Sequence, residues 1–221
     1  MEAVRRRPAG GRVLLRNVSW ETYERLMHER EERRVPRFFY DRGVMEILSP
    51  SKEHETVARV VALLVEELAV EWDLDVESAG STTFRREDLA RGFEPDECFY
   101  FTNIEVVRGK RDVNLNAGDP PPDLVFEADV TNPSLNKLPI YARLGVAEVW
   151  RYDGGRLEIL SRNSAGDGYE TVAGSAFLPS LTSGDLTRFV EEGLTVRRPT
   201  WVRRMREWAR RSRHEGSSEG G

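Results

Sequence analysis

The sequence contains few of the residues that build cysteine or histidine metal sites. Cys98 is the only cysteine among 221 residues, and only three histidines are present. A single cysteine excludes an intrachain disulfide and a cysteine-rich zinc site. No local signature pairs Cys98 with a histidine for thiol catalysis, so we expect it to be an ordinary strand residue.

Long apolar runs are also missing. The sequence has no stretch of membrane-spanning length, and the arginines near its start are not followed by the apolar segment of a signal peptide. We therefore expect a soluble, cytoplasmic protein that does not associate with membranes. With 39% hydrophobic residues, the chain can bury one substantial core.

The net charge of −5 is unevenly distributed. Residues 1–16 hold five Arg against one Glu, and residues 197–221 hold eight Arg against three Glu, so the segment between them is acidic. We expect a basic N-terminal arm over 1–16, a folded domain over 17–196, and an Arg-rich C-terminal helix with a disordered tail over 197–221. Arginines such as Arg203 and Arg204 are candidates for contacts with phosphates. The alternative is that both ends are merely solvated.

Capping residues and hydrophobic spacing predict the secondary structure. The expected helices span residues 19–33, 52–72, 134–144, 183–193 and 199–213. The expected strands lie in a hairpin over 37–49 and in segments 75–85, 94–102, 123–131, 146–152, 156–161 and 169–173. These pieces favour an α/β fold, in which a mixed sheet has helices on both sides.

One predicted strand carries several carboxylates on a single face. Alternation places Asp123, Glu127 and Asp129 on one side and apolar residues on the other. Residues two apart on a strand are separated by about 7 Å and residues four apart by about 13 Å, so Glu127 and Asp129 can converge on one cation but Asp123 cannot join them. Such oxygen ligands suit Mg²⁺ or Mn²⁺. Alternatively, this is an edge strand that shows its acids to water.

Three segments together resemble a known family. They are MEILSPSKEHE, EPDECFYF and PDLVFEADVTNPSLNKLPIYARLGVAEVWRYD, which start at Met45, Glu94 and Pro122. In this order they resemble the Uma-two family of restriction-endonuclease-like proteins, within the PD-(D/E)XK nuclease superfamily, over about residues 20–189. The resemblance implies a nuclease-like domain over 17–196, with a restriction-endonuclease-like mixed β-sheet flanked by helices.

The resemblance also implies a metal site. Asp96 would be the first metal ligand and Glu127 the second acid, with Asp129 as a further ligand. The superfamily motif has lysine where this chain has Asp129, and Lys137 in the next helix is the obvious substitute. Alternatively, Asp96 is a solvent-facing residue at a strand start, and Lys137 is an exposed helix lysine.

Two more positions that recur in the family would complete the site from the side of the long helix. Glu46 and His54 flank the entrance to that helix. The alternative for His54 is that it only decorates the helix end.

The function implied by the resemblance is Mg²⁺- or Mn²⁺-dependent hydrolysis of DNA phosphodiester bonds. We expect DNA as the partner and a homodimer, which would present two copies of the basic arms. One rival is a catalytically inactive nuclease-fold protein that binds nucleic acid or acts as an adaptor. A second is a structural dimer whose tryptophans serve packing alone.

Overall fold

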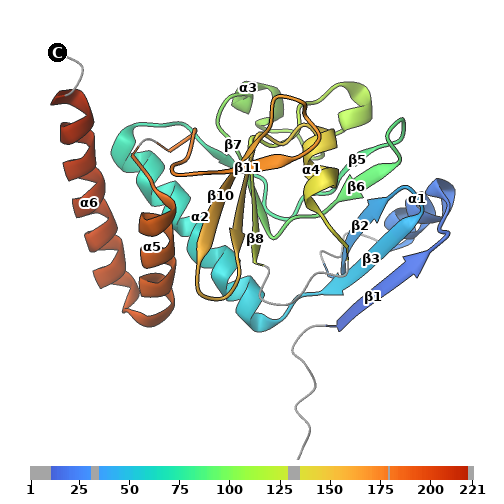
Figure 1. Cartoon of the computed structure of the whole chain (residues 1–221), viewed down its shortest axis with the longest axis horizontal. Helices are drawn as coiled ribbons and strands as arrows, with labels where there is room; N and C mark the ends of the chain where they lie inside the picture. Colours follow the sequence, from blue (N-terminus) through green and yellow to red (C-terminus); the bar gives the residue numbers. More distant parts are fainter. Residues whose placement is uncertain (1–10, 31–34, 129–134, 179, 219–221) are drawn as a thin grey trace, which may run out of the picture.

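The protein consists of two β-sheets with helices around them (Figure 1). The computed structural model describes residues 11–30, 35–128, 135–178 and 180–218, with side chains as far as Ser212. The predicted mixed α/β class is confirmed, but the strands divide between two sheets rather than forming one. None of the described helices is both long and apolar enough to cross a bilayer.

The first sheet is antiparallel and has the order β1-β3-β2-β6-β5. Its strands are β1 (Gly11–Arg16), β2 (Arg37–Asp41), β3 (Val44–Ser49), β5 (Phe84–Arg86) and β6 (Arg91–Phe93). The predicted hairpin over 37–49 is confirmed, and its turn uses positive φ at Arg42 and Gly43. β1 falls in the segment that we assigned to the N-terminal arm, where it pairs with β3. Residues 1–10 of that arm lie outside the described residues.

A helix covers the outer face of this sheet. α1 (Trp20–Glu29) begins at the predicted cap Ser19, whose side chain accepts from the Thr22 amide at 3.2 Å. The aromatic rings of Tyr23 and Tyr40 stack there, with centroids 4.7 Å apart. The opposite face of the sheet, which carries Phe39 and Leu48, packs towards residues of the second sheet.

The second sheet is mixed and has the order β11-β10-β9-β8-β7-β4. Its strands are β4 (Glu77–Ser78), β7 (Glu97–Tyr100), β8 (Leu124–Ala128), β9 (Glu148–Tyr152), β10 (Leu157–Arg162) and β11 (Tyr169–Val172). β8 pairs in parallel with β9 and antiparallel with β7, so it is a central strand, and all five of its residues are buried. The edge-strand alternative is therefore wrong. Val125, which alternation places on the same face as Glu127, packs into a second buried cluster, so this face is covered rather than open to water.

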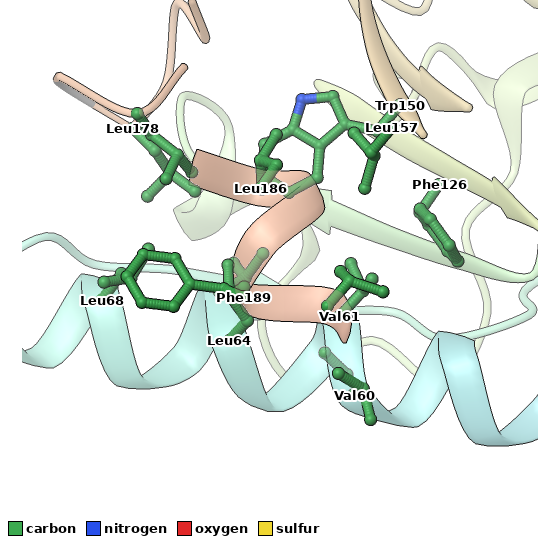
Figure 2. Close-up of a cluster of buried hydrophobic side chains, with 14 of the residues drawn as sticks. Val60, Val61, Leu64, Leu68, Phe126, Trp150, Leu157, Leu178, Leu186 and Phe189 are labelled. Atoms are coloured by element: carbon green, nitrogen blue, oxygen red, sulfur yellow. The ribbon is translucent and has the colours of Figure 1, made fainter. Parts of the chain in front are cut away.

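Three helices lie on one side of the second sheet, where the first two contact the sheet and the third packs on those two (Figure 1). They are α2 (Lys52–Trp72), α5 (Ser183–Thr195) and α6 (Arg198–Ser218). α2 matches its predicted bounds and its predicted cap Ser51, whereas α6 continues beyond the predicted end at residue 213. Figure 2 shows Phe189 of α5 beside Leu64 and Leu68 of α2, with Val61 of α2 on the side nearer Phe126 of β8, and all five residues belong to one buried cluster. This packing fixes β8 against the long helix.

The other face is covered by α3 (Ile104–Val107), the 3-10 helix η1 (Leu115–Ala117) and α4 (Leu138–Leu144). We predicted that α4 begins at Ser134, but it begins at Leu138, with Lys137 at the N-cap position. Its predicted end at Gly145 is confirmed. The single strand predicted over 75–85 is wrong, since that segment contains only the short strands β4 and β5.

Candidate active site between the two sheets

Asp96 and Glu127 lie side by side at the ends of neighbouring strands. β7 and β8 are antiparallel with Glu97 opposite Phe126, so Asp96, one residue before β7, faces Glu127 of β8. The amide of Ala128 donates to Asp96 Oδ2 at 2.7 Å. Both carboxylates are buried. The register therefore brings together two acids that are 31 positions apart in the sequence.

The Glu127 carboxylate is held by two side chains of the following helix. Lys137 Nζ donates to Oε2 at 2.5 Å, and the Tyr141 hydroxyl donates to Oε1 at 2.6 Å. Lys137 also lies over the Phe39 ring of β2, with Nζ 3.8 Å from the ring centroid. Burial, and then the Glu127 carboxylate, raises the pKa of Tyr141 well above its usual value, so the phenol remains a donor. Lys137 is thus directed at the acid rather than at solvent.

The Asp96 carboxylate is paired with Arg37 of β2. Arg37 Nη1 contacts Asp96 Oδ1, and Nη2 donates to Glu55 Oε1 of α2 at 2.7 Å. Asp96 is therefore neither solvent-facing nor unpaired. Buried carboxylates paired with a charged side chain occur both in functional sites and in purely structural ion pairs.

Glu46 and His54 lie on the side of the first sheet that faces this pair. Glu46 is opposite Phe39 in the β2–β3 hairpin, is fully buried and pairs with Arg12 Nε at 3.1 Å. His54 is buried beside Ser51, whose Oγ is 2.6 Å from Nδ1. Both residues are therefore interior groups next to the candidate site, and the contact of His54 with Ser51 lies at the start of α2.

Burial lowers the pKa of His54. The positive charges of Lys137, Arg37 and Arg12 lower it further, against the opposing charge of Glu53. His54 therefore lies within the electrostatic reach of the cations that hold the two acids, and these cations, together with burial, disfavour its protonated form.

The structure places three of the remaining residues, Asp123, Arg203 and Arg204, outside this cluster. Asp129 lies outside the described residues. Asp123 is structural, since its Oδ2 accepts from the amides of Phe101 and Thr102 at 2.7 and 2.8 Å. Arg203 and Arg204 are exposed on α6, on the far side of α2 from α4 (Figure 1).

Comparisons with known proteins identify the family and the fold of the chain. A family model described as "Uma2: Putative restriction endonuclease" matches residues 20–197. The chain belongs to the Uma2 family. A crystal structure described as a "putative nuclease belonging to DUF820" from Anabaena variabilis resembles this Uma2 protein with a TM-score of 0.53 at 10% identity. That match covers 78% of this chain and 99% of the other, and it shows a shared fold. No curated protein matches.

The donor chemistry of the Uma2 site suits a hard divalent cation. Asp96 and Glu127 each accept two donors in the structure, and an ionised carboxylate has about four lone-pair positions. Mg²⁺ uses one or two carboxylates together with waters and substrate oxygens. No cluster of three acids, histidines or cysteines suitable for a metal occurs among the residues described, so within that part of the chain the two carboxylates are the protein ligands available there.

A pocket of about 860 Å³ lies elsewhere on this Uma2 protein, next to α1. Polar residues such as Thr83, Arg85 and Asn114 line it, and no candidate site residue does. Its arginines Arg30 and Arg85 already pair with Glu94 and Glu24. The pocket therefore gives no support to the site between the sheets.

Sequence reasoning missed two residues of this cluster. Tyr141 follows Lys137 by four positions, a spacing that places both on one helix face. Its contact with Glu127 could therefore have been predicted from the sequence. Arg37 pairs with an acid 59 positions later, and no local signal indicates that pairing.

Proposed function

We propose that this Uma2 protein is a Mg²⁺- or Mn²⁺-dependent endonuclease that hydrolyses DNA phosphodiester bonds. The observation that carries the proposal is the pairing of Asp96 with Glu127 across β7 and β8, with the Lys137 amine on Glu127. Two buried acids with an adjacent amine match what metal-assisted phosphoryl transfer requires. The family's description supports a nucleic-acid substrate.

Each residue has a distinct role in this proposal. Asp96 and Glu127, with Asp129, would hold the cation, which when bound polarises a phosphodiester and lowers the pKa of water. Lys137 would orient the attacking water or stabilise charge on the phosphoryl oxygens. Tyr141 fixes Glu127, and the Lys137 ammonium lies over the Phe39 ring, which helps to hold it in place.

Glu46 and His54 would support the site from the first sheet. Glu46 balances Arg12 at the border of the cluster. Burial and the neighbouring cations lower the pKa of His54, which disfavours a positive charge that would compete with a cation.

DNA would be held by charge rather than by base reading. Arg203 and Arg204 are exposed on α6 and would neutralise phosphates without sequence preference. A homodimer would present two such helices and two sites to a duplex.

The direct test is cleavage of supercoiled plasmid in Mg²⁺ or Mn²⁺. We expect nicking by the wild type and a loss of about 10²-fold or more in Glu127→Gln and in Lys137→Ala. Matched controls are Glu97→Gln, which alters the neighbouring acid that accepts from Ser78, and Lys110→Ala, which alters a lysine paired with Asp119 on a surface loop. Both controls should cut like the wild type.

Two outcomes would overturn the endonuclease proposal. Nicking that is equal in wild type and Glu127→Gln would show that the activity does not come from this site. DNA binding without cleavage in either metal would instead identify a catalytically inactive nucleic-acid-binding or adaptor protein. The presence of Asp129 at the usual lysine position is the sequence feature that favours this second function.

A further inference from the structure

Arg37 is a buried cation inside the candidate site, and its role is not accounted for by the proposed hydrolysis. Only 3% of the residue is exposed. It stands at the start of β2 and connects two other elements, because its guanidinium contacts Asp96 before β7 and Glu55 of α2. It therefore joins a candidate metal ligand to a residue of the long helix.

The two partners of Arg37 differ in their surroundings. The Asp96 side chain is 3% exposed, and its Oδ2 is occupied by the amide of Ala128. The Glu55 side chain is 51% exposed, so it can follow the guanidinium when Arg37 moves. Arg37 thus takes the Asp96 oxygen that is not tied to the backbone, and a divalent cation on Asp96 would approach that same oxygen.

Two positive charges on one buried carboxylate repel each other strongly, because water screens them poorly there. Lys137 already neutralises Glu127, so in the arrangement described each acid has one internal cation. This arrangement keeps two adjacent carboxylates stable without a metal. It also means that metal binding competes with a side chain.

We propose that Arg37 is an internal counter-ion that holds Asp96 in the metal-free protein and gives up that contact, keeping Glu55, when a divalent cation binds. The inference rests on the proposed function, since it assumes that Asp96 and Glu127 take the metal. Arg37 therefore sets the metal affinity of the site, and Glu55 lowers the cost of releasing Asp96.

Mn²⁺ binding to the full chain, measured by electron paramagnetic resonance titration without DNA, tests this role. We expect Arg37→Gln to bind Mn²⁺ on the order of tenfold more tightly than the wild type, because a competing charge is gone. Glu55→Gln should bind several-fold more weakly, because Arg37 then has Asp96 as its remaining acidic partner. Opposite changes from two adjacent variants are not expected from general destabilisation.

The matched control is Arg91→Gln. Arg91 is a buried arginine of the same sheet that pairs with Asp41 at 2.9 Å, and its loss should leave Mn²⁺ affinity unchanged. Circular dichroism checks whether each variant folds. If Arg37→Gln does not fold, the expected weaker Mn²⁺ binding of Glu55→Gln serves as the test.

The outcomes separate this inference from the proposed function. Loss of Mn²⁺ binding in Glu127→Gln would establish the metal site. If Arg37→Gln then fails to tighten binding, the counter-ion role is overturned and the metal site remains. Where Arg37→Gln does not fold, unchanged binding by Glu55→Gln overturns the counter-ion role in the same way. If neither wild type nor Arg37→Gln shows Glu127-dependent binding, both fail. If Mn²⁺ binding that depends on Glu127 appears in Arg37→Gln but not in the wild type, the counter-ion role is supported, because Arg37 then blocks the site completely.

Discussion

At the scale of single residues, the site is defined by which donor meets which carboxylate. Glu127 is buried and accepts from a cationic amine and a phenol, while Asp96 accepts from a backbone amide and contacts a guanidinium. A buried acid that loses one of these donors has no water to replace it. Substituting the donors around the two acids should therefore change stability measurably, as substituting the acids would.

Tyr141→Phe removes one donor from Glu127 and leaves the ring packing intact. We expect a loss of about 1–3 kcal/mol in the free energy of unfolding, measured by urea denaturation, because a buried ionised oxygen loses its partner. Tyr169→Phe is the matched control, since that hydroxyl donates to the neutral carbonyl of Val146 at 2.8 Å. A smaller loss in Tyr141→Phe than in Tyr169→Phe would contradict the role given to Tyr141.

His54 predicts a pH dependence of stability. Its folded pKa is lowered, chiefly by burial and further by Lys137, Arg37 and Arg12, with Glu53 opposing. The unfolded chain, with a histidine pKa of about 6.5, therefore binds the proton more readily. Stability that is present above about pH 6.5 is lost as the pH falls through the folded pKa.

The free energy of unfolding at pH 7.5 and pH 5.5, for wild type and His54→Gln, measures this effect. The difference between the two proteins removes contributions from other groups, such as Glu97, whose pKa is raised by burial. We expect the wild type to lose more stability on acidification than His54→Gln. Equal losses would show that His54 titrates as it does in the unfolded chain.

At the scale of elements, the site depends on how tightly α2, α5 and α6 fix the sheet. Gly193 of α5 packs so closely that an added Cβ would lie 2.5 Å from Val60 Cγ1 and 2.9 Å from the Trp201 ring. Gly184, in the same helix, has room, with its nearest neighbour 3.7 Å from an added Cβ. The two glycines form a matched pair.

Gly193→Ala should lower the free energy of unfolding by about 1–3 kcal/mol through overpacking. Gly184→Ala should be neutral or stabilising by about 0.5–1 kcal/mol, because alanine favours the helix. Thermal and urea unfolding of both variants provide the measurement. If Gly193→Ala is as stable as Gly184→Ala, the three helices are less closely packed than described.

The elements that could be predicted from the sequence are those with local signals. α2 has a cap, Ser51, and apolar residues at helical spacing over its whole length, and the β2–β3 hairpin has a turn at Arg42 and Gly43. β1 was missed because Gly11–Arg16 carries arginines without clear alternation, and its strand depends on pairing with β3. The start of α4 was misplaced because Ser134 suits a cap by its chemistry alone.

The candidate site shows the same division. Asp96, Glu127 and Lys137 were predicted from the family resemblance, and the structure brings these three residues close together. Arg37 could not be predicted, because its place beside Asp96 depends on how the first sheet packs against the second. Long-range packing is what a single sequence records least directly.

At the scale of the whole molecule, charge distribution determines how the protein would meet DNA. α6 directs Arg206 and Arg210 at Glu67 and Glu71 of α2, so these arginines hold the helix in place. Arg203 and Arg204 are exposed, and the Arg204 contact with Glu192 at 3.3 Å is a surface pair that phosphates could displace. Arg203 and Arg204, which do not pair with α2 in the part of the chain that the structure describes, are the expected DNA contact, whereas Arg206 and Arg210 are engaged with α2.

The double variant Arg203→Ala/Arg204→Ala should bind duplex DNA more weakly at every sequence tested. Its slope of log affinity against log salt concentration should be shallower by about 2, because two phosphate contacts are lost. Fluorescence anisotropy over a range of salt concentrations gives both quantities, and Arg210→Ala is the control. An unchanged slope in the double variant would place the DNA surface elsewhere.

The measurement that tests the central claim most directly is the anomalous diffraction of Mn²⁺ in a crystal of this protein. We predict a peak at coordination distance, about 2.0–2.6 Å, from carboxylate oxygens of both Asp96 and Glu127, absent in crystals of Glu127→Gln. A saturated crystal in which Mn²⁺ occupies other positions and leaves these two acids with Arg37 and Lys137 alone would contradict the account.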